Sequence, residues 1–198
     1  MQQKTVGIFL FNEVEVLDFA GPFEVFSLAE SETSSERAFR VCNIARTTAP
    51  IRARNGLTVL PAYDFSSAPK LDLLIVPGGY GAEDLEIREP ETIRWLQRMA
   101  GQVEIVASIC TGAFLLAEAG LLNGKRATTH WMDLDRLERE YPAVQVLRNT
   151  RFVDEGAILT SGGISAGIDL SLYLVQRLLG APASKKTARR MEYDCSIL

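Results

Sequence analysis

Hydrophobic residues in this chain are gathered in short continuous runs that alternate with helical patterns. The runs Thr5–Phe11, Leu71–Val76 and Val103–Ala107 contain almost no polar residue, which is typical of strands in a parallel sheet covered on both faces. Helices are expected over Pro90–Ala100, which has one apolar face, and over Ala166–Leu179. Strands that alternate with helices in this way predict an α/β fold with a doubly wound sheet.

Turn-forming residues and weaker patterns predict the remaining elements. Asn55-Gly56 is a strong turn signal, so Ile51–Arg54 and Leu57–Pro61 are expected to form a hairpin. Pro22 suits a first helical turn and therefore predicts a helix over Phe23–Glu30. Further strands are expected at Phe39–Ala45, Arg126–Thr129, Val144–Leu147, Phe152–Val153 and Ala157–Thr160, and further helices at Ala113–Ala119, Met132–Tyr141 and Ala183–Tyr193.

Length and composition fit a single globular domain that covers residues 1–198, with 47% hydrophobic and 23% charged residues. The net charge of -4 gives no sign of a phosphate-binding surface, so no nucleic-acid partner is expected. The apolar runs are too short to span a bilayer, and the first residues lack the layout of a signal peptide. We therefore expect a cytoplasmic protein with no membrane partner.

The cysteines and the histidine limit the possible chemistry. Cys42, Cys110 and Cys195 are an odd number at wide spacing, which describes neither a disulfide framework nor a metal site. His130 is the only histidine, so a histidine-rich metal cluster is excluded. Because no CxxC, HExxH or carboxylate-rich loop occurs either, we expect a protein without a metal or an organic cofactor.

The segment Ser108-Ile109-Cys110-Thr111-Gly112 has the residues of a nucleophile elbow. Such a steep turn between a strand and a helix needs small residues on both sides of the nucleophile, and Ser108 and Gly112 meet that need. Free N–H groups at the start of the helix would favour a Cys110 thiolate. The alternative is a buried structural cysteine. Neither Cys42 nor Cys195 has such surroundings, so we expect Cys110 alone to be reactive.

Glycine pairs follow two other predicted strands. Gly78-Gly79 comes after Leu71–Val76, and Gly162-Gly163 comes after Ala157–Thr160. Ligands of doubly wound sheets bind outside the carboxyl ends of the strands, at the point where the strand order reverses. The Cys110 and Gly79 turns are therefore expected to face one crevice. A glycine pair alone is also compatible with a simple tight turn.

One acidic residue stands among apolar neighbours near the N-terminus. Asp18 lies between Leu17 and Phe19. A carboxylate in this position either faces solvent on an amphipathic turn or is buried for a functional reason, and the residue pattern alone favours the solvent-facing interpretation.

Four segments together resemble the ThiJ/PfpI superfamily. They are Leu17–Phe26, Ile75–Gly81, Ser108–Trp131 and Leu159–Val175, and they cover nearly the whole chain in the same order. The resemblance implies a flavodoxin-like fold, related to the class I glutamine amidotransferases, and a homodimer. Within the superfamily, the chain is most similar to the isonitrile hydratases and to the sensor domains of some AraC-type regulators.

The resemblance assigns roles to individual residues. Cys110 matches the elbow nucleophile, and Asp18 matches an acid that reaches over the sulfur, which is Glu in several branches and Asp in the isonitrile hydratases. Thr111 matches the residue after the nucleophile and would hold Asp18 or a water molecule. Gly78 and Gly79 match a turn whose amides face the sulfur. The resemblance therefore favours a functional, buried Asp18.

Further residues show which branches of the superfamily the chain does not resemble. PfpI-type peptidases have His after the nucleophile, where this chain has Thr111, and a glutaminase triad needs His further downstream, where none follows His130. His130 matches a position near the sulfur in some members but is not required in the hydratase branch, so it is either structural or substrate-binding. Trp131 lines the crevice or fills the core, and the core is favoured. Candidate substrate-binding residues are Gly78, Gly79, Tyr80, His130 and Trp131.

The resemblance implies an enzyme that hydrates isonitriles to N-substituted formamides, with a small-molecule substrate. Two alternatives stay open. One is a stand-alone module that senses a ligand or oxidation, because few residues follow Tyr193 and no DNA-binding segment is expected there. The other is a deglycase or glyoxalase acting on 2-oxoaldehydes, which uses the same cysteine but usually pairs it with Glu.

We predict a homodimer, because the resemblance implies one and because the segment Val14–Phe26 has an excess of apolar residues. Light or X-ray scattering at micromolar concentration should give twice the mass of the 21.8 kDa chain. A mass matching one chain would contradict the prediction.

Overall fold

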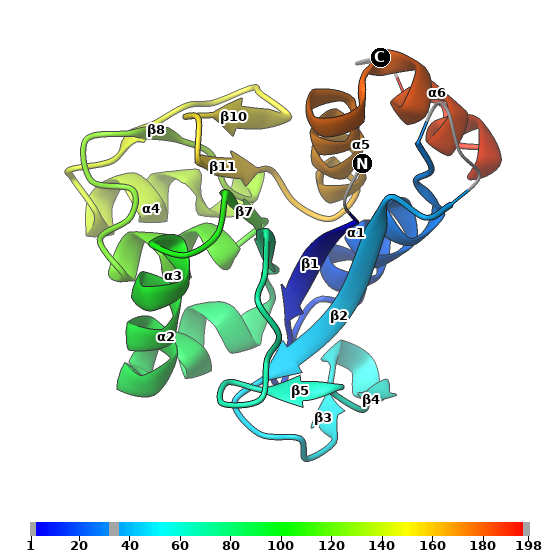
Figure 1. Cartoon of the computed structure of the whole chain (residues 1–198). Helices are drawn as coiled ribbons and strands as arrows, with labels where there is room; N and C mark the ends of the chain where they lie inside the picture. Colours follow the sequence, from blue (N-terminus) through cyan, green and yellow to red (C-terminus); the bar gives the residue numbers. More distant parts are fainter. Residues whose placement is uncertain (1–2, 32–35, 196–198) are drawn as a thin grey trace.

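The structure is a computed structural model that describes residues 3–31 and 36–195. Its centre is a sheet with the strand order β10-β11-β7-β6-β1-β2-β5 (Figure 1). All neighbouring strands are parallel except β10 and β11. The strands are β1 (Lys4–Phe9), β2 (Phe39–Ala45), β5 (Tyr63–Asp64), β6 (Leu73–Val76), β7 (Ile105–Ile109), β10 (Phe152–Asp154) and β11 (Ile158–Ser161).

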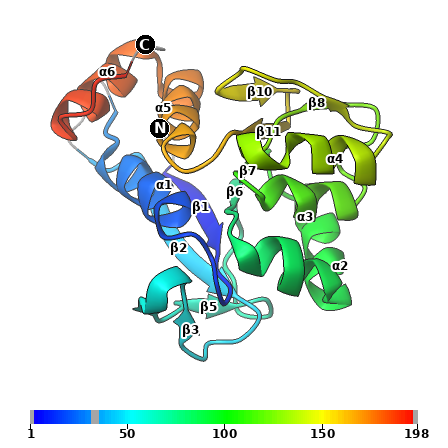
Figure 2. The same ribbon diagram turned by 180° about the vertical axis from the view of Figure 1, so that it is seen from behind.

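Helices cover both faces of this sheet (Figures 1 and 2). On one side lie α1 (Val16–Leu28), α5 (Ala166–Leu179) and α6 (Ala181–Arg190), and on the other lie α2 (Pro90–Ala100), α3 (Gly112–Glu118) and α4 (Leu134–Glu140). The continuous apolar strands are buried between the two layers, as a parallel sheet requires. The doubly wound, flavodoxin-like α/β fold expected from the sequence is confirmed.

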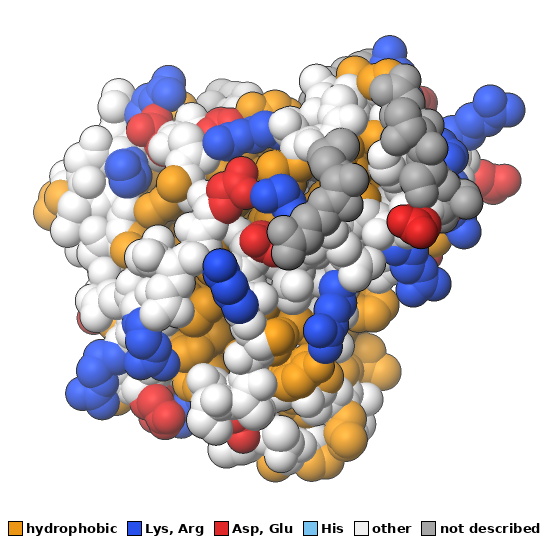
Figure 3. Space-filling model, viewed as in Figure 1, with side chains coloured by type: hydrophobic (Ala, Val, Ile, Leu, Met, Phe, Trp, Pro, Cys, Tyr) orange, Lys and Arg blue, Asp and Glu red, His pale blue; other side chains and the backbone are white. Residues whose placement is uncertain are grey.

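Smaller elements surround the sheet. The expected hairpin forms between β3 (Ile51–Arg52) and β4 (Thr58–Val59), which pair antiparallel. Its turn residues Asn55 and Gly56 have φ of 61° and 91°, which explains the Asn-Gly sequence. Hydrophobic side chains gather over this hairpin in the space-filling view (Figure 3). The other short elements are the parallel pair β8 (Arg126–Ala127) and β9 (Gln145–Val146), and single helical turns at Arg54–Gly56, Gly81–Leu85, Glu86–Arg88 and Trp131–Asp133.

Helix α1 differs most from the sequence expectation. It begins at Val16 instead of Phe23, so Pro22 lies inside it and Asp18 lies in its first turn. Pro22 has no N–H to donate to the carbonyl four residues earlier, but apolar side chains that follow it in the helix, such as Phe26, are fully buried. Tertiary packing therefore extends the helix through the proline, and this places Asp18 against the sheet.

No helix among the described residues is both long and apolar enough to cross a membrane. The expected helix over Met132–Tyr141 is shorter, because its first residues form part of the single turn Trp131–Asp133 and α4 begins at Leu134. The helices expected over Pro90–Ala100 and Ala166–Leu179 have those bounds in the structure.

The start of α3 packs very closely against the end of the neighbouring strand β6. A Cβ atom added at Gly112 would lie 2.2 Å from the carbonyl oxygen of Val76 and 2.7 Å from that of Pro77. Both contacts are with backbone, which cannot move aside easily. Gly112 therefore lets the elbow sit directly against the turn that follows β6.

We predict that Gly112→Ala destabilises the protein by about 1–3 kcal/mol, the usual range for an extra methyl in a filled site. The matched control is Gly101→Ala, where the nearest backbone atom would be 3.6 Å away; it should change stability by less than about 0.5 kcal/mol. Urea unfolding of both variants measures the difference. Equal effects would show that the elbow can relax.

Candidate active site

Cys110 occupies a strained turn between β7 and α3. Its φ is 56°, a left-handed conformation that is uncommon for residues other than glycine. The surrounding backbone holds it there: the Cys110 N–H donates to the carbonyls of Ser161 and Gly162, both at 3.2 Å, and its carbonyl accepts a 2.8 Å hydrogen bond from the Thr129 hydroxyl. The expected elbow geometry is present, and only 7% of Cys110 is exposed.

Asp18 is fully buried beside this cysteine. One carboxylate oxygen accepts a hydrogen bond from the Gly78 N–H and the other from the Ile164 N–H, each at 3.1 Å. The Cys110 thiol lies close enough for the charge of Asp18 to raise its pKa. The solvent-facing interpretation of Asp18 is therefore wrong, because α1 starts early enough to turn its first acidic residue inward.

Burial changes the proton affinity of both groups. It raises the pKa of Asp18 to about 7, with a smaller contribution from the charge of Glu15, although the Gly78 N–H works in the opposite direction. Burial and the charge of Asp18 raise the pKa of the Cys110 thiol, while the Thr111 N–H lowers it. The lowered pKa expected for Cys110 is therefore not found beside an ionised Asp18. Two anions cannot share this site comfortably, so the pair retains a proton.

The glycine turn after β6 meets the elbow through Thr111. The Thr111 hydroxyl accepts a 2.9 Å hydrogen bond from the Gly79 N–H and lies 3.3 Å from the Gly79 carbonyl, to which it can donate. Thr111 thus holds the turn instead of Asp18. The expectation that the Gly78 and Gly79 amides face the sulfur is also wrong, because they donate to Asp18 and to Thr111.

A cavity of about 520 Å³ opens at Cys110. Four predicted site residues line it: Gly79, Cys110, Thr111 and His130. Sequence reasoning did not identify the other lining residues as part of the site, although the Gly162-Gly163 pair pointed to the loop that carries Ile164. These additional residues are Glu15, Arg54, Glu83, Met132, Asp133 and Ile164.

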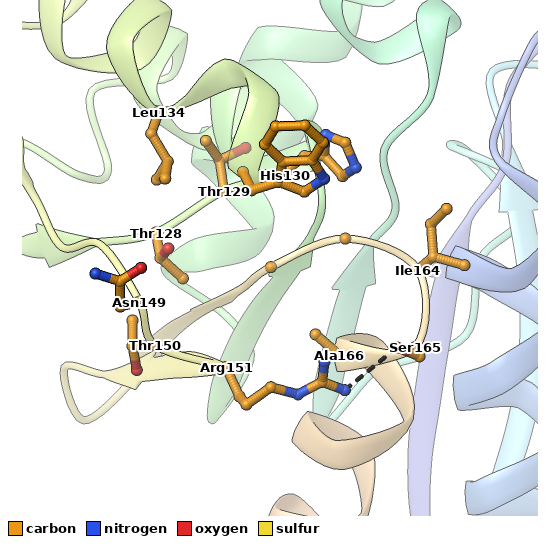
Figure 4. A pocket seen from close by; sticks show the side chains of 13 residues that line it. Thr128, Thr129, His130, Leu134, Asn149, Thr150, Arg151, Ile164, Ser165 and Ala166 are labelled. Atoms are coloured by element: carbon orange, nitrogen blue, oxygen red, sulfur yellow. Dashed lines mark hydrogen bonds between the residues drawn. The ribbon is translucent and has the colours of Figure 1, made fainter.

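A second cavity, of about 530 Å³, adjoins the first (Figure 4). His130 and Ile164 line both cavities and so form the boundary between them. Arg151 enters the second cavity below the Ile164 loop, where it bonds to Asp169 and donates to Ser165 at 3.3 Å. The remaining lining residues include Thr128, Thr129, Trp131, Leu134, Asn149 and Thr150.

The other predicted residues are spread around these cavities. Trp131 lines the second cavity and is 74% exposed, so the core position favoured from the sequence is wrong; the residue follows β8 in a surface turn. Tyr80 is half exposed and lines neither cavity. The His130 ring lies against the backbone of Gly163, where a Cβ atom would approach its Cδ2 to 2.2 Å.

A cysteine on a strained turn between a parallel strand and a helix, with a buried carboxyl group beside it, defines an elbow-type α/β protein. The chain belongs to the DJ-1/PfpI family, whose model matches residues 4–177. Among curated proteins, isonitrile hydratase of Pseudomonas putida is 36% identical over 188 residues, which are 95% of this chain and 78% of that protein.

Regulators and solved structures complete the comparison. The HTH-type transcriptional regulator GbdR of Pseudomonas aeruginosa is 28% identical over 96% of this chain, which spans about half (51%) of that protein. A ThiJ/PfpI family protein from Pseudomonas syringae superposes with a TM-score of 0.87 at 26% identity, covering 98% of this chain and 76% of that one. Drosophila melanogaster DJ-1beta, at 17% identity, shares the fold with a TM-score of 0.84 over 98% of this chain and all (100%) of its own.

The raised pKa of Asp18 predicts how stability depends on pH. Between the ordinary value of 3.8 and about 7, the folded protein keeps a proton that the unfolded chain has released, so stability falls as pH rises through this window. Asp18→Asn has no proton to release. The stability advantage of the wild type over this variant should therefore shrink between pH 4 and pH 8, by up to about 4 kcal/mol.

Urea unfolding at several pH values measures this difference. Asp18→Asn is expected to be less stable in absolute terms at pH 4, because an asparagine oxygen can replace only one of the two acceptors for the Gly78 and Ile164 amides. A difference that stays constant with pH would show that Asp18 ionises normally inside the fold.

Proposed function

We propose that the chain hydrates isonitriles to N-substituted formamides, with Cys110 as nucleophile and Asp18 as the group that moves protons. The observation that carries the proposal is the fully buried Asp18 carboxyl group, which two backbone amides hold beside the elbow cysteine, while that cysteine lines a cavity. The 36% identity with an isonitrile hydratase supports the choice of substrate. Small-molecule substrates of this class fit a cavity of about 520 Å³.

The first step adds sulfur and hydrogen to the isonitrile carbon. Transfer of the Cys110 proton to Asp18 gives a thiolate beside a carboxylic acid. The raised Asp18 pKa of about 7 favours this transfer, whereas the raised pKa of the Cys110 thiol opposes it. The sulfur attacks the terminal carbon, and Asp18 delivers its proton to the same carbon. The product is a thioimidate on Cys110, with Asp18 left as carboxylate.

The second step consumes water. The Asp18 carboxylate takes a proton from a water molecule while the water oxygen attacks the thioimidate carbon. Asp18 then passes this proton to the thioimidate nitrogen, and the carbon–sulfur bond breaks. The formamide leaves, and a proton from the new hydroxyl group returns to Asp18. Isonitrile and water are consumed, the formamide is released, and the Cys110–Asp18 pair returns to its starting state.

Backbone contacts hold this pair in place. The Gly78 and Ile164 amides fix both oxygens of Asp18, and Thr111 ties the glycine turn to the elbow. These residues act as positioning groups in the proposal. Such fixed hydrogen bonds keep a reacting pair at productive distance without reorganisation during the reaction.

A ligand-sensing module is the second candidate function. It is favoured by the 28% identity with a transcriptional regulator over 96% of this chain. In that case the cavity binds a small molecule without converting it, and Cys110 supplies a contact or a site of oxidation.

Turnover assays distinguish these functions. Purified protein should hydrate a simple isonitrile and should not convert methylglyoxal, the substrate of the 2-oxoaldehyde alternative. Cys110→Ala should abolish hydration without unfolding the protein. The matched control is Cys42→Ala, because Cys42 is buried in β2 away from the cavity; its rate should remain that of the wild type.

Variants of Asp18 test the proton transfer. Asp18→Asn should lower hydration about a hundredfold or more, the usual scale for loss of a general acid. Asp18→Glu should be milder because it keeps a carboxyl group. Hydration by Asp18→Asn at the wild-type rate would disprove the mechanism, and absence of any turnover by the wild type would favour the sensing function.

A further inference from the structure

Charged side chains in the wall of the Cys110 cavity are mostly acidic. Glu15, Glu83 and Asp133 line it together with one cation, Arg54. The three carboxylate side chains are only 21% to 23% exposed, so solvent screens them less than it screens ordinary surface charges.

Cations of the protein neutralise part of this charge. Arg54 lies 3.6 Å from Glu15, and Arg136, which does not line the cavity, forms a 2.7 Å ion pair with Glu83. The ion-pair partner found for Asp133 is His130, whose Nδ1 lies 3.5 Å away and carries charge only when protonated. Asp133 is therefore the carboxylate with the weakest compensation by the protein itself.

Mutual repulsion among these groups is visible in their proton affinities. The charge of Asp133 contributes to the raised pKa of Glu83, although burial is the larger cause. The same Asp133 charge adds a minor contribution to the raised pKa of Cys110, after burial and Asp18. An added positive charge in the cavity would relieve each of these repulsions at once.

The carboxylates are not arranged as ligands of a metal ion. Within residues 3–31 and 36–195, no group of three or more His, Cys, Asp or Glu side chains could hold one. An organic cation needs no such ligand set, because a single carboxylate can pair with an ammonium or guanidinium group. Met132, which is 67% exposed, provides adjacent apolar surface for the carbon groups around such a charge.

We propose that the Cys110 cavity selects substrates or ligands that carry an organic cation, such as an ammonium or guanidinium group, which lies against Asp133 and Glu83. Asp133 is the specificity-determining residue in this arrangement. The inference rests on the proposed function only in taking Cys110 as the group that the ligand approaches. It specifies a charge for the part of the molecule that does not react.

Thiol reagents that react by the same chemistry but differ in charge test this selectivity directly. Methanethiosulfonates with a trimethylammonioethyl, a sulfonatoethyl or a methyl group transfer the thioalkyl group to a thiolate and release methanesulfinate. Mass spectrometry of the peptide that contains Cys110 measures the rate at which each reagent modifies this residue. Each rate is then divided by the rate of the same reagent with free 2-mercaptoethanol. The normalised rate for the cationic reagent should exceed that for the anionic one at least tenfold and approach it in high salt.

Variants test whether the charged side chains of the cavity cause the preference for the cationic reagent. Asp133→Asn should lower the cation-to-anion ratio several-fold, and Arg54→Gln should increase it. The matched control is Glu91→Gln, because Glu91 is an exposed residue of α2 outside the cavity; it should leave the ratio unchanged. Equal normalised rates in the wild type, or an unchanged ratio in Asp133→Asn, would overturn the proposal.

A second measurement needs no reaction at Cys110. Millimolar benzyltrimethylammonium should raise the melting temperature of the wild type by more than phenylmethanesulfonate does, and Asp133→Asn should lose the difference. Equal shifts for both ions would overturn the charge selectivity. Neither experiment uses an isonitrile, so failure of hydration with intact charge selectivity would contradict only the proposed function.

Discussion

The site depends on one buried carboxyl group that joins three distant parts of the chain. Asp18 belongs to the first turn of α1, and its oxygens bind the amide after β6 and the amide before α5, at Gly78 and Ile164. Its third neighbour is Cys110 at the end of β7. A buried charge is unfavourable without such partners. The hydrogen bonds that make Asp18 tolerable are therefore the same contacts that hold the site together.

The strand order explains why these contacts can form. β6 lies between β1 and β7, and β11 lies on the other side of β7. The carboxyl ends of adjacent parallel strands meet at one edge of the sheet, so the turns after β6, β7 and β11 are neighbours there. Close backbone approach at Gly112 removes the remaining space between two of these turns. The cavity then opens at Cys110, with Asp18 buried beside that cysteine, and is bordered by charged side chains.

Sequence patterns predicted the parts of the fold that depend on local chemistry. The bounds of α2 and α5 coincide with the expected helices over Pro90–Ala100 and Ala166–Leu179, because the pattern of apolar residues there is clear. The start of α1 was missed because Pro22 is an unfavourable interior residue that only tertiary packing makes acceptable.

The site was predictable to a smaller extent. Small flanking residues revealed Cys110, whereas the burial of Asp18 followed from the family resemblance and not from the local pattern. Nothing in the sequence indicates that Ile164 donates its amide to Asp18 or that Asp133 lines the cavity. Such convergence is decided by strand order and loop path, which residue patterns do not specify.

The backbone conformation of Cys110 lowers the folding stability of the turn at the same residue that carries the thiol group. A residue with a side chain at φ 56° is less favourable there than glycine, which adopts this conformation freely. The most easily folded version of this turn would therefore have no nucleophile. Selection for stability alone would therefore favour glycine, and the cysteine at this position is explained if the proposed chemistry at its thiol outweighs the loss of stability.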